Sequence, residues 1–268
     1  MLLAVDVGNT QTVLGLYEYV ADKKAEAGKR ATVEPKLIFK SRIASAATDS
    51  TDEILLKLTG LFSLNGVDTS AISAVAVASV VPSLTEQWQE VALTLTDTKP
   101  LILTSSTPTD LSYRYSNPAE IGADRIADAV AAIHLYGAPV LVVDFGTATN
   151  IEVIDKEGAF VGGIIAPGLA ISADALFAAA ARLSNIAIEI PEKIIGSSTK
   201  GAVQTGLTYG EIDRIDGLVR RVFSELGYEA SVVATGGLSH RVLELSGTIT
   251  HVNDDLTLEG LRLIYEQQ

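Results

Sequence analysis

The first segment of the chain pairs a continuous apolar run with an alternating one. Apolar residues 2–5 lead into Asp6, a polar turn follows at residues 8–10, and apolar residues then alternate over residues 13–17. A continuous run is typical of a buried strand, and alternation is typical of a strand with one buried face. The pattern therefore predicts two antiparallel strands joined by a tight turn at Gly8.

The same pattern recurs about half a chain later. Apolar residues 139–143 lead into Asp144, the turn contains Gly146 and Thr147, and a second alternating strand follows Thr149. Repetition of one supersecondary unit indicates an internal duplication. We therefore expect an α/β protein with two related lobes, each presenting one turn to a shared cleft.

Apolar residues spaced three and four positions apart predict helices between these strands. Thr51 or Asp52 is expected to cap the first helix, and Ser83 the second. An alanine-rich helix is expected to end near Leu183. The polar residues 18–35 are expected to form the tip of a hairpin. The other expected strands lie at residues 37–43, 71–81, 100–104, 230–235 and 248–252. One further helix is expected to begin at residue 123, and three more are expected at residues 200–227, 238–245 and 258–266.

The first turn has the chemistry of a phosphate and metal site. Gly8 allows a ligand to approach the backbone, while Asn9, Thr10 and Thr12 add short polar side chains. Asp6, at the carboxyl end of a buried strand, suits a hydrated cation better than it suits packing. The Walker sequence G-x-x-x-x-G-K-[ST] does not occur. A hairpin turn without a ligand explains one such turn equally well, but two in the same context favour a nucleotide held between lobes.

Composition narrows the class of protein. The formal net charge is −13, which disfavours nonspecific binding to nucleic acid or to acidic membranes. The chain contains no cysteine, which excludes disulfides, cysteine zinc sites and a thiol nucleophile. No apolar run reaches the roughly 18 residues that a membrane-spanning helix needs, and no basic segment of a signal peptide precedes the first strand. We expect a cytoplasmic enzyme.

Asp124 and the pair Gly236-Gly237 each have two interpretations. Asp124 stands at the start of a predicted helix, where a carboxylate stabilises the helix dipole without any catalytic role. Its place shortly before the strand that ends at Asp144 favours a role in the cleft. The two glycines follow a core strand, where they either leave room for a base or sugar or form an ordinary strand-to-helix turn.

Several motifs together resemble a known family. The two turns and Thr235-Gly236-Gly237 occur in the order of the phosphate and adenosine motifs of the acetate kinase/sugar kinase/heat-shock/actin superfamily. Within that superfamily the chain resembles type III pantothenate kinase along nearly its whole length. The motifs that carry this resemblance are Asp6-Val7-Gly8-Asn9-Thr10, Ser79-Val80-Val81-Pro82, Tyr115-x-Asn117-Pro118, Gly122-Ala123-Asp124-Arg125, Asp144-Phe145-Gly146-Thr147-Ala148-Thr149 and Ala166-Pro167-Gly168.

The resemblance implies two duplicated ribonuclease-H-like (actin-like ATPase) lobes, with mixed sheets flanked by helices and a cleft between them. The N-terminal lobe is expected at residues 1–120 and the C-terminal lobe at residues 121–268. The implied activity is ATP-dependent phosphorylation of pantothenate, the first step of coenzyme A synthesis. The implied cofactors are Mg²⁺ and a monovalent cation, K⁺ or NH₄⁺. The implied assembly is a homodimer with the substrate pocket near the subunit interface.

The resemblance also implies roles for individual residues. Asp124 resembles the general base, and Asp144 resembles the ligand of the monovalent cation. Asn150 departs from the family pattern, in which a threonine is expected. The ATP contacts implied are Asp6, Val7, Gly8, Asn9, Thr10, Gln11, Thr12, Val13 and Thr147. The pantothenate contacts implied are Tyr115, Gly122, Ala123, Asp124, Arg125 and Thr199.

Two other functions remain open from the sequence. One is a non-catalytic regulator that keeps the fold, since this family has relatives described as transcriptional accessory factors. The joint presence of Asp124, Asp144 and Thr147 argues against that reading, because a regulator needs no base. The other is a kinase of the same superfamily that acts on a different small hydroxylated acid or sugar.

Overall fold

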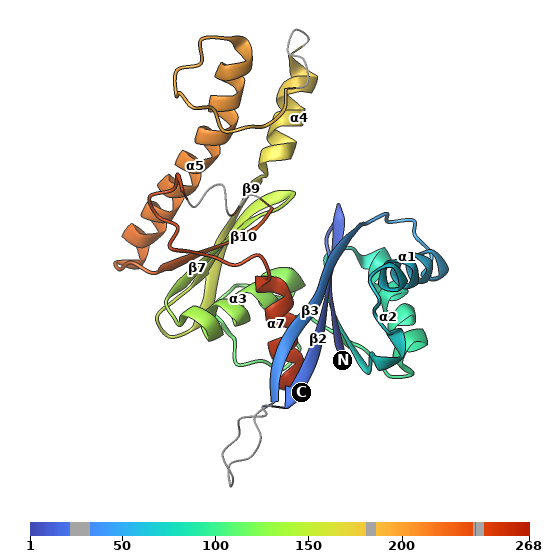
Figure 1. Cartoon of the computed structure of the whole chain (residues 1–268). Helices are drawn as coiled ribbons and strands as arrows, with labels where there is room; N and C mark the ends of the chain where they lie inside the picture. The colour runs from blue at the N-terminus through green and yellow to red at the C-terminus, as the bar shows by residue number, and fades with distance from the viewer. Residues whose placement is uncertain (22–32, 181–185, 238, 240–243) are drawn as a thin grey trace. The chain divides into compact units, whose positions relative to one another are not determined.

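The chain forms two compact units, each described here by itself (Figure 1). The structure is a computed structural model that describes residues 1–21, 33–180, 186–237, 239 and 244–268. Both units are discontinuous in sequence. Unit 1 contains Met1–Asp110, Asn117–Ala131 and Thr257–Gln268, and unit 2 contains Leu111–Ser116 and Ala132–Leu256. The expected lobes divide at a single point instead, and whether residues 1–120 and 121–268 behave as separate domains stays a prediction.

The sheet of unit 1 has the strand order β3-β2-β1-β4-β5. At its centre, β1 (Leu2–Val7) pairs antiparallel with β2 (Gln11–Ala21) and parallel with β4 (Ala74–Ser79). The strands β3 (Val33–Ala44) and β5 (Leu101–Ile102) form the two edges. The predicted turn between two antiparallel strands is therefore confirmed. Most of the expected hairpin tip lies outside the described residues.

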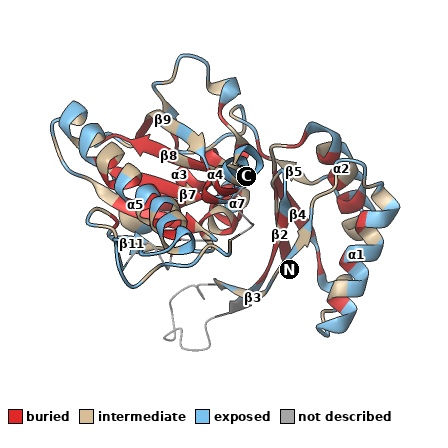
Figure 2. Ribbon diagram, turned by 90° about the horizontal axis from the view of Figure 1, so that it is seen from above, coloured by how far each residue is buried: buried red, intermediate tan, exposed pale blue. Residues whose placement is uncertain are grey.

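Helices α1 (Thr51–Leu64) and α2 (Pro82–Thr96) pack on one face of this sheet. Successive strand residues point to opposite faces, so the odd-numbered residues of β1 share a core with Phe62 and Trp88. Figure 2 shows the central strands of this sheet as mostly buried and the outer sides of both helices as exposed. The 3₁₀ helix η1 (Thr69–Ala71) lies between α1 and β4.

The predicted caps of α1 and α2 are wrong. Ser50 caps α1: its hydroxyl accepts from the Glu53 N–H at 3.3 Å, and the Glu53 carboxylate accepts from the Ser50 N–H at 2.8 Å. Ser50 has an extended backbone, as a cap requires, whereas Thr51 already lies within the helix. The second helix begins with Pro82 and has no side-chain cap, because its N-cap residue is Val81, which has no polar side chain. Ser83 lies inside the helix, and its hydroxyl donates to the Ala47 carbonyl.

Helix α7 (Leu256–Glu266) packs on the same unit although it is the last helix of the chain. The Tyr17 hydroxyl donates to the Glu259 carboxylate at 3.0 Å. A Cβ on Gly260 would lie 2.0 Å from the carbonyl oxygen of Ala127, so only glycine lets α7 approach α3 (Ala123–Tyr136) this closely.

The sheet of unit 2 repeats the topology of the first. Its order is β11-β10-β7-β8-β9-β6, in which β9-β8-β7-β10-β11 corresponds to β3-β2-β1-β4-β5 with the same parallel and antiparallel pairings. This correspondence confirms the internal duplication. The strands are β6 (Ser112–Tyr113), β7 (Val140–Phe145), β8 (Ala148–Ile154), β9 (Ala159–Pro167), β10 (Ser231–Gly236) and β11 (His251–Val252).

The long helix α5 (Thr199–Leu226) covers one face of this sheet, and its residues Ile212, Ile215 and Val219 share a core with β7 and β10. Helix α4 (Leu169–Ala179) packs beside α5 (Figure 1). The prediction that this helix runs to about Leu183 is wrong, because Ala180 has an extended backbone and α4 ends at Ala179. Most of the predicted segment 238–245 lies outside the described residues. Within the described part of the chain, no helix has both the length and the apolar character of a membrane span.

Candidate active site

The first turn is held by its own backbone and presents polar side chains. The Gly8 N–H donates to the Gln11 carbonyl at 3.1 Å, and the Ser45 N–H donates to the Thr10 carbonyl at 3.0 Å. Asn9, Thr10 and Gln11 are exposed, and Asp6 is half-buried at the end of β1. The turn therefore offers short polar groups on a fixed frame.

Three of the expected ATP contacts are less exposed than Asn9, Thr10 and Gln11. Val7 is buried within the core of unit 1, and Val13 is half-buried on β2. Thr12 is buried, and its hydroxyl lies 2.8 Å from the Ser45 hydroxyl. The side chains of Val7 and Thr12 hold the turn in place, so contacts from these two residues to a ligand would come from main-chain atoms.

The second turn has a similar frame with an additional support. The Gly146 N–H donates to the Ala148 carbonyl at 3.0 Å, and the Gly168 N–H donates to the Thr147 carbonyl at 3.1 Å. A Cβ on Gly168 would lie 2.4 Å from the Gly146 carbonyl oxygen. Thr147 is exposed, and Asp144 is half-buried at the end of β7. Gly168, the residue after β9, thus lies close to the backbone of the second turn and holds it in place.

Gly236 belongs to the same cluster as Asp144. Strand β10 runs parallel to β7 with Gly236 opposite Phe145, and the φ of Gly236 is +88°. A Cβ at this position would lie 2.6 Å from both Asp144 Oδ1 and the Phe145 carbonyl oxygen. The absence of a side chain at Gly236 therefore gives the Asp144 carboxylate its place.

Asp124 lies in the first turn of α3, after the 3₁₀ helix η2 (Pro118–Glu120). Its Oδ1 accepts from the Arg125 N–H at 2.8 Å, and a Cβ on Gly122 would lie 2.4 Å from the same oxygen. Burial raises the pKa of Asp124 above its usual range, although the N–H and the charge of Arg125 act in the opposite direction. The result is a carboxylate that is more basic than an ordinary one.

The expected substrate contacts fall in both units. Unit 1 holds Gly122–Arg125, with Ala123 and Arg125 buried. Unit 2 holds Tyr115, whose ring meets the Phe160 ring edge-to-face at a centroid distance of 5.8 Å. Unit 2 also holds Thr199, the exposed first residue of α5. The structure brings Gly122–Arg125 together in one unit, and Asp144, Thr147 and Gly236 in the other.

The donor groups fit a metal that arrives with a nucleotide. Among the described residues, no group of three or more His, Cys, Asp or Glu side chains could hold a metal ion. Single carboxylates, Asp6 and Asp144, instead stand at the strand ends beside the turns. Mg²⁺ is commonly bound by one or two carboxylates together with substrate phosphates and water, which matches this donor set.

The polar groups of α5 that support the second turn are not evident from the sequence. The Thr149 hydroxyl donates to the Glu211 carboxylate at 2.7 Å, and Glu211 pairs with Arg214. One signal was available, because Glu211 adjoins Ile212 on the face of the helix that packs on the sheet. Its partner Thr149 is 62 positions away in the sequence, which no local pattern reveals.

Comparison with known proteins decides the family. The family model described as type III pantothenate kinase matches residues 2–221. The chain belongs to the type III pantothenate kinase family. A type III pantothenate kinase from Anaeromyxobacter sp. (strain Fw109-5) is 41% identical over 267 residues, which are 100% of this chain and 99% of the relative. Another from Roseiflexus sp. (strain RS-1) is 43% identical over 266 residues, 99% and 98% of the two chains.

Solved structures show the fold of this family member. A Baf family protein from Campylobacter jejuni superposes with a TM-score of 0.54 at 16% identity, covering 99% of this chain and 98% of that one. The ethanolamine utilization protein EutJ from Carboxydothermus hydrogenoformans gives a TM-score of 0.51 at 16% identity, covering 98% and 89%. Together with the duplicated mixed sheets, these likenesses confirm the expected α/β fold of two ribonuclease-H-like lobes.

Proposed function

We propose that this protein transfers the terminal phosphoryl group of ATP to pantothenate and forms 4'-phosphopantothenate, the first step of coenzyme A synthesis. The observation that carries the proposal is membership of the type III pantothenate kinase family over residues 2–221. A carboxylate with a raised pKa at Asp124 and two glycine turns with exposed polar groups are the parts that such a reaction requires.

Asp124 acts as the general base. Its ionised carboxylate accepts the proton of the pantothenate hydroxyl as that oxygen attacks the terminal phosphorus of ATP, whose bond to the bridging oxygen breaks so that ADP leaves. The N–H of Arg125 holds Oδ1 in one orientation, and burial makes the carboxylate a better proton acceptor. General base catalysis of this kind contributes roughly 10²–10⁴-fold to the rate.

The two turns hold the phosphates of ATP. Backbone N–H groups and short polar side chains at Asn9, Thr10 and Thr147 can donate to phosphate oxygens. Bound Mg²⁺ neutralises phosphate charge, and Asp6 would hold it through water. This neutralisation matters because the chain itself carries a net charge of −13.

Five further residues are proposed to contact pantothenate. Gly122, Ala123 and Arg125 adjoin the base, and the Arg125 guanidinium supplies positive charge for a substrate that is itself a carboxylate. Tyr115 and Thr199 are the other two. These roles are carried over by position from the family motifs.

Asp144 is proposed to bind a monovalent cation. Its half-buried carboxylate stands beside the second turn, where Gly236 leaves it space. We expect K⁺ and NH₄⁺ to support turnover, and Na⁺ to support it poorly, as the match of Asp144 to the cation ligand of the family implies. Initial rates in chloride salts of the three cations at equal ionic strength measure this. Equal rates in all three salts would remove the cation site from the proposal.

The proposed assembly is a homodimer, and the proposed location is the cytoplasm, where ATP is supplied. Large apolar side chains of unit 2 remain exposed on β9, on α4 and in the segment before α5, as a subunit interface requires. They are Ile165, Ile171, Leu176, Ile190, Ile194 and Ile195.

The test is ADP release from Mg-ATP, with and without pantothenate, in a potassium buffer. Pantothenate-dependent release, with formation of phosphopantothenate detected by mass spectrometry, is the expected result. ADP release that responds to another small hydroxylated acid, and not to pantothenate, would point to a different substrate. No release from the folded protein with any acceptor would favour a non-catalytic regulator.

A further inference from the structure

An ion pair on α5, between the buried Glu211 and the half-buried Arg214, has no part in the reaction described above. Glu211 is only 6% exposed, and its Oε1 accepts from the Thr149 hydroxyl at 2.7 Å. Its Oε2 pairs with the guanidinium of Arg214, and that guanidinium also donates to the Pro167 carbonyl at 2.9 Å. One carboxylate is therefore linked to the first residues of β8 and to the last residue of β9.

These contacts adjoin the second turn. Ala148, the first residue after the turn, pairs with Pro167 in the antiparallel ladder of β8 and β9, so Thr149 on β8 and Pro167 at the end of β9 both lie beside the turn. The residue after Pro167 is Gly168, whose N–H donates to the Thr147 carbonyl. A shift of Pro167 would consequently move Gly168 and, with it, Thr147.

The ion pair and the cation site use opposite faces of the sheet. Thr149 shares the face of Ile151, which packs with α5, whereas Asp144 and its cross-strand neighbour Asn150 belong to the other face. Glu211 thus supports the turn without occupying the face that Asp144 uses.

A buried carboxylate is a costly way to pack a helix on a sheet. Apolar residues such as Ile212 and Ile215 already supply that packing, and a buried ion pair is often no more stabilising than apolar side chains of the same size. Unlike apolar packing, hydrogen bonds depend on direction, and they hold the side chains of Thr149 and Arg214 in one orientation each. The ion pair is therefore better explained by placement of the turn than by stability.

We propose that Glu211 is a positioning residue that acts through Thr149 and Arg214 to hold the second turn in the geometry that binds the phosphates of ATP. The inference rests on the proposed function, because it takes Thr147 as a phosphate contact. Glu211 itself does not touch the nucleotide.

Three substitutions separate the components of this support. Thr149→Val removes the hydroxyl at nearly constant shape, Thr149→Ser retains it, and Glu211→Gln keeps an acceptor while removing the charge that Arg214 needs. The probe is the non-hydrolysable analogue AMP-PNP with Mg²⁺ in a potassium buffer, with the dissociation constant measured by calorimetry. The pantothenate KM and the unfolding temperature are measured for the same proteins.

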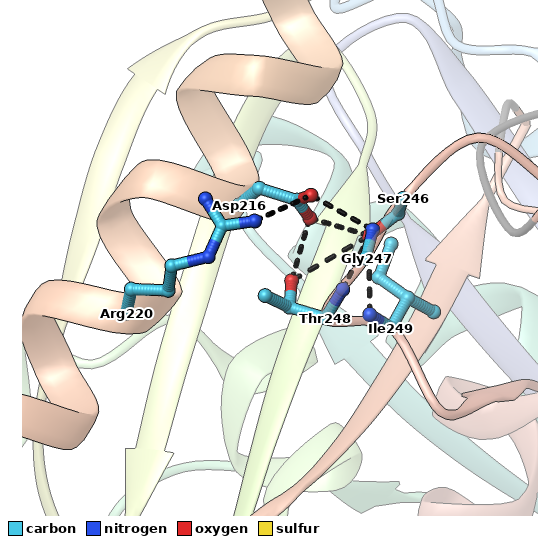
Figure 3. A network of polar contacts seen from close by, with 6 residues as sticks. All are labelled: Asp216, Arg220, Ser246, Gly247, Thr248 and Ile249. Atoms are coloured by element: carbon cyan, nitrogen blue, oxygen red, sulfur yellow. Dashed lines mark hydrogen bonds and ion pairs between the residues drawn. The ribbon is translucent and has the colours of Figure 1, made fainter.

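Asp216 provides a matched control on the same helix (Figure 3). It is as buried as Glu211, pairs with Arg220 at 3.2 Å, and accepts from the Thr248 hydroxyl and the Gly247 N–H at 2.7 and 2.8 Å. Burial alone would raise the pKa of Asp216, but these donors hold it below its usual range. The segment it holds precedes β11 and bonds to Val232 near the start of β10, at the opposite end of that strand from Gly236.

We expect Thr149→Val and Glu211→Gln to weaken AMP-PNP binding by about tenfold, because each removes a charge-assisted contact that holds the turn. Thr149→Ser should bind within about twofold of wild type because the hydroxyl is retained. Asp216→Asn should lower the unfolding temperature and leave nucleotide binding unchanged. The pantothenate KM should change in none of the four variants.

Wild-type binding by both Thr149→Val and Glu211→Gln would overturn the positioning role. So would a loss in Asp216→Asn equal to that in Glu211→Gln, because the effect would then be one of general stability. If the wild-type protein binds AMP-PNP but releases no ADP with pantothenate, the proposed function fails, and the binding comparison still decides the role of Glu211. A wild-type protein that binds no nucleotide overturns both.

Discussion

At the residue scale, the burial of Asp124 favours its role as a base but lowers the stability of the folded protein. A carboxylate whose folded-state pKa is raised costs stability as the pH rises above its unfolded pKa, and the cost is complete once the pH exceeds the folded-state pKa, because the ionised form is less favourable in the folded protein than in the unfolded chain. Asp124→Asn should therefore abolish turnover, because an amide accepts no proton, and should raise the unfolding temperature near neutral pH. Steady-state kinetics and calorimetric melting measure the two effects.

The pH dependence supplies a check on this prediction. Below the unfolded value of about 3.9, Asp124 is protonated in both states, so the stability gained by Asp124→Asn should disappear there. Asp128, one turn later on α3, accepts from the Thr257 hydroxyl at 2.7 Å and serves as the comparison. Asp128→Asn should keep kcat. Wild-type turnover in Asp124→Asn would remove Asp124 from the role of base.

At the scale of elements, the backbone at the end of β10 and the Asp144 carboxylate at the end of β7 are in close contact. Gly236 has a positive φ, and the nearest atom to a Cβ there would be a carboxylate oxygen of Asp144. Gly236→Ala should lower the free energy of unfolding by roughly 1–3 kcal/mol, since the left-handed backbone is strained with any side chain. It should also raise the K⁺ concentration needed for half-maximal activity, because the Asp144 carboxylate must move.

The adjacent glycine is a matched control for this substitution. A Cβ on Gly237 would meet no atom within 4 Å. Gly237→Ala should therefore leave the K⁺ requirement unchanged, as measured in the same rate assay. An unchanged K⁺ requirement in Gly236→Ala as well would show that the close approach to Asp144 has no bearing on cation binding.

At the scale of the whole molecule, exposed apolar side chains on unit 2 allow the proposed homodimer to be tested. Ile195 is 85% exposed and Ile194 is 57% exposed, both in the segment before α5. Sedimentation velocity should give a mass of twice the 28.2 kDa chain. Replacing both isoleucines by aspartate should shift the protein to the monomer, because two charges would have to be buried at the interface.

Leu64, at the end of α1 in unit 1, is 88% exposed and provides the control. Leu64→Asp should sediment as the wild type does. A wild-type mass of one chain would contradict the homodimer, and a dimer that survives both isoleucine substitutions would place its interface elsewhere.

Much of the candidate site could be predicted from the sequence because its motifs are local. Each turn consists of an apolar strand, an Asp-x-Gly segment and an alternating strand within about 15 consecutive residues, and hairpins of this kind are set by neighbouring residues. The cap of α1 was mispredicted for the opposite reason. Ser50, Thr51 and Asp52 are consecutive residues that can each cap a helix, and only the backbone conformation selects Ser50.

The sequence by itself determined the duplicated strand–turn–strand units, the long helix α5 and the family, since periodicity and motif order are properties of consecutive residues. Only the tertiary structure decided that α7 joins unit 1, that Gly236 lies against Asp144, and that Glu211 reaches Thr149. These pairs are far apart along the chain. Their contacts arise from strand register and helix packing, which depend on the whole fold rather than on any short stretch of sequence.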